Sequence, residues 1–543
     1  MQRMTVETHP IAGQKPGTSG LRKKTKVFME PHYLENFVQA IFTGIGGAAG
    51  KTFVVGGDGR YFNDRAIQVI LRMAAAGGAV RVIVGQGGLL STPAASNLIR
   101  QRGTDGGIIL SASHNPGGPD ADFGIKFNMP NGGPAPEDVT NRIFAATEEL
   151  TSYHIVEAQD VDLSALGTTS LAGMMVEVVD PVASYAALMD DLFDFDAIRS
   201  LFQSGFTMRF DAMHAITGPY ATEILERRLG AGPGTVLNGT PSPDFGNGHP
   251  DPNPIWAKPL VDLVMGPNAP DFAAASDGDG DRNMILGKGI YVTPSDSLAV
   301  LAANAHLAPG YAKGLAGVAR SMPTSRAVDR VAAARGLPCF ETPTGWKFFG
   351  NLLDDGRITL CGEESAGTGS DHVREKDGLW AVLLWLNILA TTRKSVAELL
   401  EAHWQEYGRN FYTRHDYEAV ETEMANAVMD GVRAKLGNLP GQSFAAGVIS
   451  AADEFAYDDP VDGSRSKGQG LRVMFEGGAR VVFRLSGTGT EGATIRVYLE
   501  AFEDDHARIG ADPVEALAAV VESAEAISGL RMTTGRAGPD VTT

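Results

Sequence analysis

The sequence predicts an α/β protein of several domains, in which three similar α/β units precede a smaller α+β unit. Three observations lead to this prediction. The 543 residues exceed what one hydrophobic core usually serves. Strand and helix patterns alternate three times along the chain, which is typical of βαβ units and a largely parallel sheet. The last part instead contains a hairpin pattern and a single long helix.

The first unit follows from apolar runs and helical spacing. In the helix expected over 64–76, Ile67, Ile70, Leu71 and Ala74 fall on one face. A second helix is expected over 93–102. The strands of this unit are expected at Thr52–Val55, Val80–Val84 and Ile108–Leu110.

The pattern then recurs twice. The second unit is expected to contain strands at 208–211, 235–237 and 272–275 and a helix over 220–229. The third is expected to contain strands at 315–319, 339–340 and 358–361 and helices over 325–335 and 345–353. In each unit a late strand ends in a loop dense with reactive groups, which indicates one shared site between domains.

The final unit differs in its pattern. Strands are expected at 471–475, 479–484 and 493–499, with Glu476-Gly477-Gly478 as a hairpin turn. A helix over 513–527 closes the unit. We expect the junction before it near Gln405–Arg409 and a loose polar tail over Met532–Thr543.

Composition and charge exclude several classes of protein. The net charge of −19 disfavours nucleic acid and anionic membranes as partners. The longest apolar stretch, Leu379–Ala390, is shorter than the roughly 20 residues that span a bilayer. The first ten residues lack the apolar segment of a signal peptide, and two cysteines favour a reducing compartment over a disulfide framework. We therefore expect a soluble cytoplasmic enzyme.

The stretch around Ser113 is the first candidate for chemistry. The apolar run Ile108–Leu110 predicts a buried strand, and the composition of Asn115–Gly118 strongly favours a turn. Ser113 is therefore expected on a loop at the carboxyl end of a strand, where open α/β sheets bind ligands. His114 beside it could donate hydrogen bonds or transfer protons. By itself this segment also fits a glycine-rich turn with an incidental serine.

Asp277, Asp279 and Asp281 alternate with glycine after an apolar strand. Three carboxylates on a tight loop repel one another unless a cation lies among them, and an oxygen-only ligand set favours Mg²⁺. An EF-hand is excluded, because its sixth position would be Arg282 and its twelfth Lys288. One coordination position remains for a group brought by Ser113, such as a phosphoryl oxygen, and Arg282 could hold another phosphoryl oxygen.

Two further loops carry groups suited to sugars and protons. Gly362-Glu363-Glu364-Ser365 offers carboxylates and a hydroxyl that can bind vicinal sugar hydroxyls, although a solvated turn fits these residues equally well. Lys376 could act as an acid or base if its pKa is depressed, and an ordinary surface lysine is the alternative.

Two segments have the composition of phosphate sites. Arg484 and Arg496 flank Ser486-Gly487-Thr488-Gly489, whose hydroxyls and backbone N–H groups suit a phosphate monoester. The N-terminal octapeptide KPGTSGLR likewise offers Thr18, Ser19 and Arg22, although a polar turn remains an alternative. The Walker lysine pattern of nucleotide-binding loops is missing.

Four motifs together carry a family resemblance. They are SASHNPGG, SDGDGDRN, GEESAGTGSDHVREKDGLW and RLSGTGTEGATIR. In this order they resemble the α-D-phosphohexomutase superfamily, with the closest likeness to phosphoglucomutases of the long, eukaryotic-type branch. The likeness runs from KPGTSGLR through Pro343–Leu352 to the C-terminal tail. One departure is Ser111, where the family usually has threonine.

The resemblance implies four domains around a central cleft: three α/β domains with mixed sheets at 1–180, 181–292 and 293–408, and an α+β lid at 409–543. It implies that Ser113 is carried as a phosphoserine and binds one Mg²⁺ per subunit together with the three aspartates. The reacting end of the site would be lined by Arg22, His114, Lys126 and Lys376, with the general base unassigned. Substrate contacts would come from Thr18, Ser19, Arg282, Thr344, Gly345, Glu363, Ser365, Arg484, Ser486, Gly487, Thr488 and Arg496.

The implied activity is interconversion of glucose 1-phosphate and glucose 6-phosphate, with glucose 1,6-bisphosphate as intermediate and activator. Phosphoryl transfer needs positioning and charge neutralisation, which a metal and cations supply. Three alternatives stay open: another phosphohexomutase acting on mannose or glucosamine phosphates, a hydrolase that releases phosphate, and a non-catalytic binding paralogue. The partner is a phosphosugar, not nucleic acid or membrane, and the protein is expected to be a monomer or homodimer.

Overall fold

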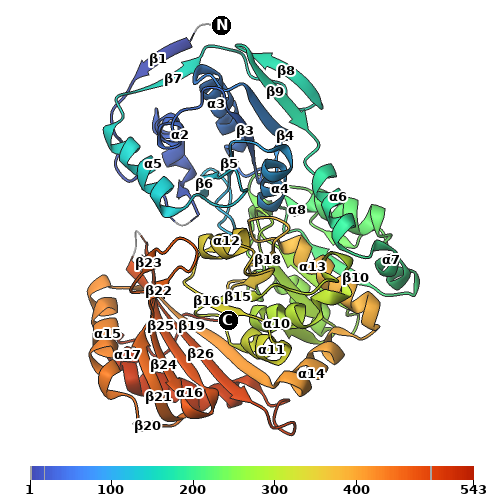
Figure 1. Cartoon of the computed structure of the whole chain (residues 1–543), viewed down its shortest axis with the longest axis vertical. Helices are drawn as coiled ribbons and strands as arrows, with labels where there is room; N and C mark the ends of the chain where they lie inside the picture. The colour runs from blue at the N-terminus through green and yellow to red at the C-terminus, as the bar shows by residue number, and fades with distance from the viewer. Residues whose placement is uncertain (1–2, 18, 490–491) are drawn as a thin grey trace.

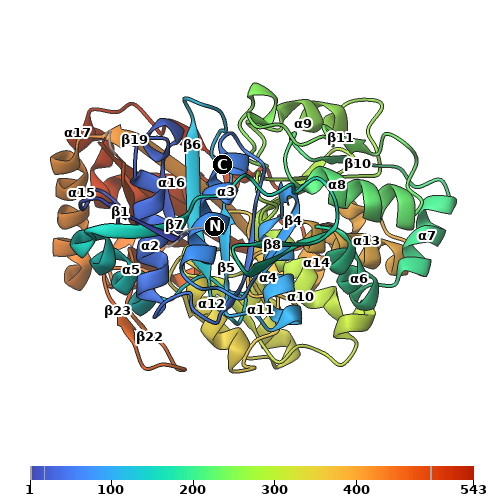
Figure 2. The same ribbon diagram turned by 90° about the horizontal axis from the view of Figure 1, so that it is seen from above.

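The structure, a computed structural model, describes residues 3–17, 19–489 and 492–543, with the backbone alone for residues 487–489. Four sheets follow one another along the chain, and Figure 1 shows the units that contain them. The first unit lies at one end of the molecule, and the fourth lies beside the third. In the view from above (Figure 2), the first and second units lie beside each other.

The first unit contains a seven-stranded mixed sheet in the order β2-β6-β5-β3-β4-β9-β8. Its strands are β2 (Leu21–Lys24), β3 (Thr52–Gly57), β4 (Arg81–Leu89), β5 (Gly107–Leu110), β6 (Asp122–Asn128), β8 (Gly167–Leu171) and β9 (Met174–Val179). Its helices are α1 (Thr25–Phe28), α2 (Tyr33–Gly44), α3 (Asn63–Ala76), α4 (Thr92–Arg102) and α5 (Glu137–Glu149). A separate antiparallel pair is formed by β1 (Arg3–Glu7) and β7 (Ser152–Val156).

The second and third units contain smaller mixed sheets, ordered β11-β10-β12-β13-β14 and β16-β15-β17-β18. The second unit comprises α6 (Ala183–Leu192), α7 (Phe195–Gln203), β10 (Met208–Asp211), α8 (Thr217–Ala221), β11 (Val236–Leu237), α9 (Lys258–Met265), β12 (Phe272–Ser276), β13 (Asn283–Gly287) and β14 (Ile290–Val292). The third comprises α10 (Pro294–Asn304), β15 (Val318–Ser321), α11 (Ala327–Arg335), β16 (Cys339–Thr342), α12 (Trp346–Asp354), β17 (Leu360–Gly362), β18 (Thr368–Ser370), α13 (Gly378–Thr392) and α14 (Val396–Tyr407).

The same strand arrangement occurs in all three units. A first strand lies between two parallel neighbours, and the later of these neighbours pairs with an antiparallel fourth strand. The connection between the third and fourth strands carries Ser113 in the first unit, the three aspartates in the second and Glu363 in the third. The repeat expected from the strand and helix pattern is therefore confirmed, and it delivers the three loops from equivalent positions.

The fourth unit is an α+β domain. Its seven-stranded sheet has the order β20-β21-β24-β25-β26-β19-β27, and every described pairing is antiparallel. The strands are β19 (Arg409–Val420), β20 (Ser443–Phe444), β21 (Gly447–Glu454), β24 (Leu471–Phe475), β25 (Arg480–Gly489), β26 (Gly492–Glu503) and β27 (Val541–Thr542), with a small pair β22 (Tyr457–Asp458) and β23 (Arg465–Ser466). The helices are α15 (Thr422–Lys435), α16 (Pro513–Ser528) and α17 (Leu530–Thr534).

The helix expected over 220–229 is present, as α8 followed by a π-helix, Thr222–Arg228. One expectation about secondary structure was wrong. The tail expected to be loose is ordered, because β27 pairs with β19 and Thr543 exchanges two backbone hydrogen bonds with Arg414. The pattern of polar residues in the tail gave no sign of this pairing.

The apolar run Leu379–Ala390 forms the centre of α13, which is buried along most of its length. Asp377 caps this helix by accepting a hydrogen bond from the Trp380 backbone, and the rings of Trp380 and Trp385 are fully buried. This helix belongs to a hydrophobic cluster that packs the first, second and third units together. In the part of the chain that the structure describes, no helix combines the length and apolar character needed to cross a bilayer.

His403 on α14 makes stability depend on pH. The side chain is buried beside Tyr407, and burial, with a smaller effect of Arg335, lowers its pKa from 6.5 to about 4. Between pH 6.5 and pH 4, His403 is protonated in the unfolded chain but neutral in the folded protein. The free energy of unfolding should therefore fall as the pH drops from 6.5 to 4. The loss should reach at most about 3 kcal/mol.

Urea unfolding of the wild type and His403→Phe across this pH range tests the expectation. The variant has no titrating ring at this position, so its stability should decline less steeply by that amount. Parallel pH profiles for the two proteins would contradict the assignment.

Candidate active site

Ser113 follows β5 on a turn that holds its backbone in the left-handed region, with φ of 52°. Such a conformation is uncommon for a residue other than glycine and clusters at functional sites. Its N–H donates to Ser111 Oγ at 2.7 Å, and its carbonyl accepts a hydrogen bond from Arg60 at 2.8 Å. Arg60 in turn forms a fully buried ion pair with Asp58, which also accepts the Ser111 hydroxyl. The turn is thus fixed on both sides of Ser113.

The serine and aspartate loops meet directly. The Ser113 hydroxyl donates to Asp277 Oδ2 at 2.9 Å. Ligand oxygens of Asp277, Asp279 and Asp281 lie within 4.8 Å of one another, and all three side chains are buried. Gly278 permits this approach, because a Cβ there would lie 2.4 Å from the Ser113 carbonyl oxygen.

The charges of this cluster favour a bound cation. Burial and the neighbouring Asp281 and Asp279 raise the pKa of Asp277 well above its ordinary value. Burial alone would raise the pKa of Asp279. The charge of Lys126 and a hydrogen bond from Thr92 outweigh this effect, so the pKa is lowered. One buried oxygen of Asp279 and one of Asp281 have no hydrogen-bond partner among the described residues. Unpaired buried carboxylate oxygens in an oxygen-only set fit a hard divalent cation such as Mg²⁺.

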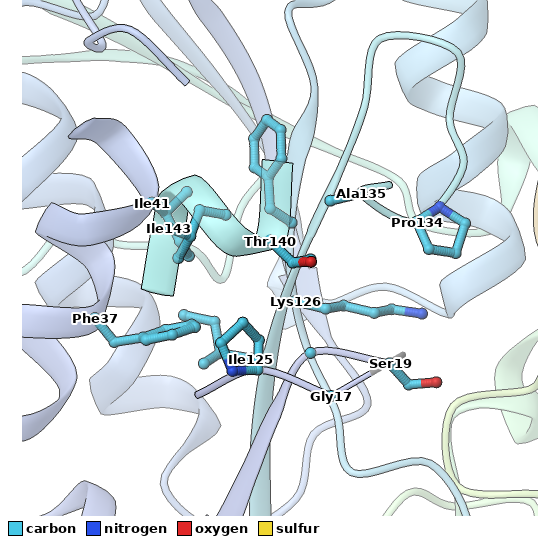
Figure 3. Close-up of a pocket in the computed structure, with 13 residues that line it drawn as sticks. Gly17, Ser19, Phe37, Ile41, Ile125, Lys126, Pro134, Ala135, Thr140 and Ile143 are labelled. Carbon is cyan, nitrogen blue, oxygen red and sulfur yellow. The ribbon is translucent and has the colours of Figure 1, made fainter. Parts of the chain in front are cut away.

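Two lysines border the cluster, each paired across a domain boundary. Lys376 of the third unit lies 3.0 Å from Asp281 Oδ2, and Lys126 of the first unit lies 2.9 Å from Glu375 Oε1. Burial lowers the pKa of Lys126, but the Glu375 carboxylate outweighs this effect, so the pKa is raised and the amine stays charged. Figure 3 shows the Lys126 amine and the Ser19 hydroxyl pointing the same way, away from the apolar side chains of a small cavity.

His114, Arg22 and Arg282 complete the polar surroundings. His114 Nδ1 lies 3.4 Å from Ser113 Oγ, and burial together with the charge of Arg282 lowers its pKa well below 6.5, so the ring is neutral. Arg282 pairs with Asp251 at 3.5 Å. The Nε atoms of Arg22 and Arg282 are buried without a hydrogen-bond partner among the described residues. These guanidinium groups are therefore available to an anion.

In the third unit the expected sugar-contacting residues lie together. Glu363 accepts a hydrogen bond from the Gly345 backbone at 3.1 Å, which joins its loop to the start of α12. Burial raises the pKa of Glu363, although Lys376 opposes the shift. The Thr344 hydroxyl is buried without a partner among the described residues, and Ser365 is half-buried.

Backbone hydrogen bonds fix the aspartate loop to the first and third units. The Thr92 N–H donates to the Asp279 carbonyl, the Gly378 N–H to the Gly280 carbonyl and the Asn283 N–H to the Ala366 carbonyl, all at 3.0 Å. A Cβ at Gly378 would lie 2.0 Å from the Arg282 carbonyl oxygen. The aspartate loop is therefore held between the first and third units.

The fourth unit presents two arginines on one face of its sheet. Arg484 on β25 and Arg496 on β26 are direct cross-strand partners. Like charges in this position repel. Arg496 also lies 3.7 Å from the Asp416 carboxylate on β19, whereas no ion pair of Arg484 occurs among the described residues. Ser486 lies on the same strand as Arg484, whereas the side chains of Gly487 and Thr488, and residue Thr18, lie outside the described residues. Within the described residues, no hydrogen bond or ion pair links Arg484 or Arg496 to the serine and aspartate loops.

Sequence reasoning missed the residues that support this site. Asp58 and Arg60 hold the Ser113 turn, Thr92 donates to Asp279, and Glu375 holds Lys126. The available signal was the position of Asp58 and Arg60 just after β3, at the carboxyl ends of the parallel strands where β5 also ends.

Three repeated α/β units that each deliver one polar loop to a common site, followed by an α+β unit with paired arginines, form the architecture of a phosphohexomutase. Family models match the whole series: phosphoglucomutase/phosphomannomutase α/β/α domains I, II and III match residues 13–154, 183–289 and 294–407. The C-terminal domain of phosphoglucomutase-1 matches residues 409–540. The chain belongs to the phosphoglucomutase/phosphomannomutase family.

Similar proteins cover the full length of the chain. A phosphoglucomutase of Rhizobium radiobacter is 59% identical over 99% of both chains. A probable cytoplasmic phosphoglucomutase of Arabidopsis thaliana is 52% identical over 99% of both chains, and the chloroplastic phosphoglucomutase of that plant is 52% identical over 99% of this chain and 89% of its own. The open form of parafusin from Paramecium, described as a phosphoglucomutase, is 49% identical and superposes with a TM-score of 0.94 over 100% of this chain and 99% of its own.

Proposed function

We propose that this protein is a phosphoglucomutase, an isomerase that interconverts glucose 1-phosphate and glucose 6-phosphate through a phosphorylated Ser113. The observation that carries the proposal is the 2.9 Å contact between the Ser113 hydroxyl and Asp277, at the edge of a buried three-carboxylate cluster. Full-length likeness to proteins named phosphoglucomutase supports it. A coupled assay for glucose 6-phosphate formed from glucose 1-phosphate, with trace glucose 1,6-bisphosphate, tests it directly. Steady release of inorganic phosphate instead would indicate a hydrolase.

The proposal includes a domain division and a cofactor. The four domains would span 1–180, 181–292, 293–408 and 409–543 around a central cleft, with the fourth acting as a lid. Asp277, Asp279, Asp281 and the phosphorylated Ser113 would hold one Mg²⁺, for which the unpaired buried oxygens of Asp279 and Asp281 are support. When bound, Mg²⁺ neutralises charge on the transferring phosphoryl group. We also propose a cytoplasmic location, in line with the likeness to a relative named cytoplasmic.

Different residues of the site would have different roles in phosphoryl transfer. The fixed turn aims the Ser113 oxygen, so that a sugar hydroxyl can approach the phosphoryl group in line. Lys126, Lys376, Arg22 and Arg282 would balance the charge of the phosphoryl oxygens. His114 is neutral and therefore acts as a hydrogen-bonding group, not as a cation. The phosphoryl group would pass to O6 of glucose 1-phosphate, after which Ser113 would take the phosphoryl group from O1.

Glu363→Gln should weaken discrimination between sugars more than it weakens phosphate binding. A buried carboxylate that pairs a particular hydroxyl is left unpaired when an epimer binds, so losing it should lower the selectivity ratio about tenfold. The measurement is kcat/KM for glucose 1-phosphate against mannose and galactose 1-phosphates. Glu401→Gln on the exposed face of α14 is the matched control. An equal loss of kcat/KM for all three sugars would show that Glu363 does not discriminate between them.

Arg496→Ala should raise KM and release the bisphosphate between half-reactions. Removing one charge-assisted hydrogen bond costs roughly 1.5–3 kcal/mol, or about ten- to a hundredfold in binding. The KM effect and trapped free glucose 1,6-bisphosphate during turnover are both measured. Arg433→Ala is the control, since the ion pairs of this exposed arginine of the same domain are, within the described part of the chain, with Asp430 and Glu454. An unchanged KM with no extra release would remove the fourth domain from the phosphate site.

A further inference from the structure

The turn Ser321–Arg326 follows β15. It lies between the fourth domain and the loop Gly362–Ser365, which we call the sugar loop. Its central residue, Thr324, is 1% exposed. The Thr324 hydroxyl accepts a hydrogen bond from the Glu364 backbone N–H at 2.8 Å, and its own hydrogen can go to Ser321 Oγ at 2.7 Å. Glu364 directly follows Glu363, so this hydroxyl fixes the backbone that carries the proposed sugar-contacting carboxylate.

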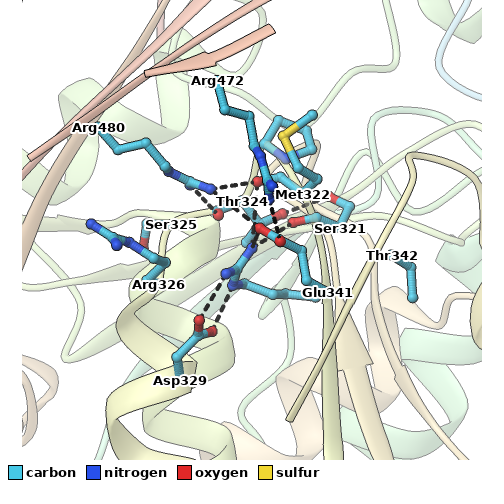
Figure 4. Close-up of polar contacts among 12 residues, drawn as sticks. Ser321, Met322, Thr324, Ser325, Arg326, Asp329, Glu341, Thr342, Arg472 and Arg480 are labelled. Atoms are coloured by element: carbon cyan, nitrogen blue, oxygen red, sulfur yellow. Dashed lines mark hydrogen bonds and ion pairs between the residues drawn. The ribbon is translucent and has the colours of Figure 1, made fainter. Parts of the chain in front are cut away.

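The fourth domain holds the same turn from the other side. Arg480 on β25 donates to the Met322 carbonyl at 2.8 Å and to the Thr324 carbonyl at 2.7 Å. Figure 4 shows Arg480 reaching from β25 to the turn, and Arg472 of β24 reaching to Glu341 on β16. Thr324 thus contacts the fourth domain through its carbonyl and the sugar loop through its hydroxyl.

A buried ion pair keeps Arg480 in this position. Arg480 and Glu500 are cross-strand partners, lie 2.9 Å apart and are 2% and 1% exposed. Glu500 also accepts hydrogen bonds from the Arg326 backbone at 2.8 Å and from Asn410 at 2.6 Å. Breaking a buried pair of this kind leaves an uncompensated charge, so the pair holds the turn firmly against the sheet of the fourth domain.

We infer that Thr324 is a positioning residue, which sets the sugar loop according to how the fourth domain sits on the third. The inference rests on the proposed function, because Glu363 is the group being positioned. Movement of the Arg480–Glu500 pair would move the Thr324 carbonyl, and the Thr324 hydroxyl would carry that displacement to the Glu364 backbone. The sugar loop and the fourth domain would then move together.

A merely structural role for the hydroxyl makes a different prediction, and the chain offers a matched control. Thr359, also in the third unit and buried, accepts the Ala316 N–H at 2.9 Å through its hydroxyl. Both hydroxyls satisfy one backbone N–H, but only that of Thr324 bonds to the sugar loop. Valine in place of either threonine keeps the shape and leaves one backbone N–H unpaired.

The test compares Thr324→Val, Thr324→Ser and Thr359→Val by thermal unfolding and by kcat and KM for glucose 1-phosphate and mannose 1-phosphate. Thr324→Val should raise KM for glucose 1-phosphate three- to tenfold and lower the selectivity for glucose, whereas Thr324→Ser should restore both. Thr359→Val should lower stability with unchanged KM and selectivity. Equal kinetics of the two valine variants, or failure of serine to restore KM, would overturn the inference.

A second arm tests the link to the fourth domain. Glu500→Gln should raise KM in the wild-type background and add little further effect in Thr324→Val, because both changes act through the same turn. Additive effects would show that the ion pair acts elsewhere. An inactive wild type would refute the proposed function, whereas normal kinetics of Thr324→Val in an active background would refute only the role of Thr324.

Discussion

Ser113→Ala is expected to abolish mutase turnover, with a loss of at least about 10⁴-fold in kcat/KM. Ser113 is the residue whose hydroxyl donates to Asp277, and its turn is braced by Ser111 and Arg60. Water cannot replace a hydroxyl that both gives and receives the phosphoryl group. Kinetics in the coupled assay and intact-protein mass, before and after incubation with glucose 1,6-bisphosphate, measure the effect.

The mass measurement separates loss of the acceptor from loss of the fold. Wild type should exchange one phosphate, and the variant should carry none while keeping its unfolding temperature. Ser204→Ala is the control, because its hydroxyl donates to the Leu201 carbonyl at the end of α7, remote from the site. Turnover in Ser113→Ala close to wild type would exclude a phosphoserine at this position.

Asp279→Asn should lower kcat about 10²–10³-fold with a much smaller change in KM. The substitution removes one negative charge from the proposed cation ligands, and a metal contributes most to the charge that develops in the transition state. Chelation of the wild type should mimic the variant, and added Mg²⁺ should restore the chelated wild type. Mg²⁺ should also raise the unfolding temperature of wild type more than that of Asp279→Asn, which gives a readout besides activity.

Asp271→Asn is the matched control for this experiment. Asp271 precedes the opposite end of β12 and bonds to Thr207, outside the cluster. Its substitution should leave both kcat and the effect of Mg²⁺ unchanged. Full activity of the wild type in metal-free buffer would rule out the cation.

The sequence predicted the parts of the fold and site that local chemistry determines. Apolar runs marked β5, β12 and β17, and the polar groups that follow each run identified all three loops. Glycines and carboxylates crowded on one loop indicated a cation cluster, and the structure brings Asp277 within reach of Ser113, 164 residues away along the chain. Equivalent places in a repeated unit made that meeting predictable.

Contacts between residues that are far apart in the sequence could not be predicted in the same way. Glu375 meets Lys126 across 249 residues and Arg60 meets Ser113 across 53, and no local periodicity encodes either pairing. The Arg480 contacts with the Thr324 turn are equally remote. The tail was misjudged for the same reason, since β27 is ordered only by its partner β19. Burial and charge compensation become visible only when the units are packed.

The close backbone approaches at Gly278 and Gly378 bear on inherited variation. Each codon specifies a residue without a side chain, at a place where one added carbon would collide with a neighbouring domain's backbone. Missense changes at these codons would therefore displace backbone that carries the site, although neither glycine supplies a side chain to the reaction. Mutational drift towards another sugar would have to begin elsewhere, at half-buried side chains such as Ser365.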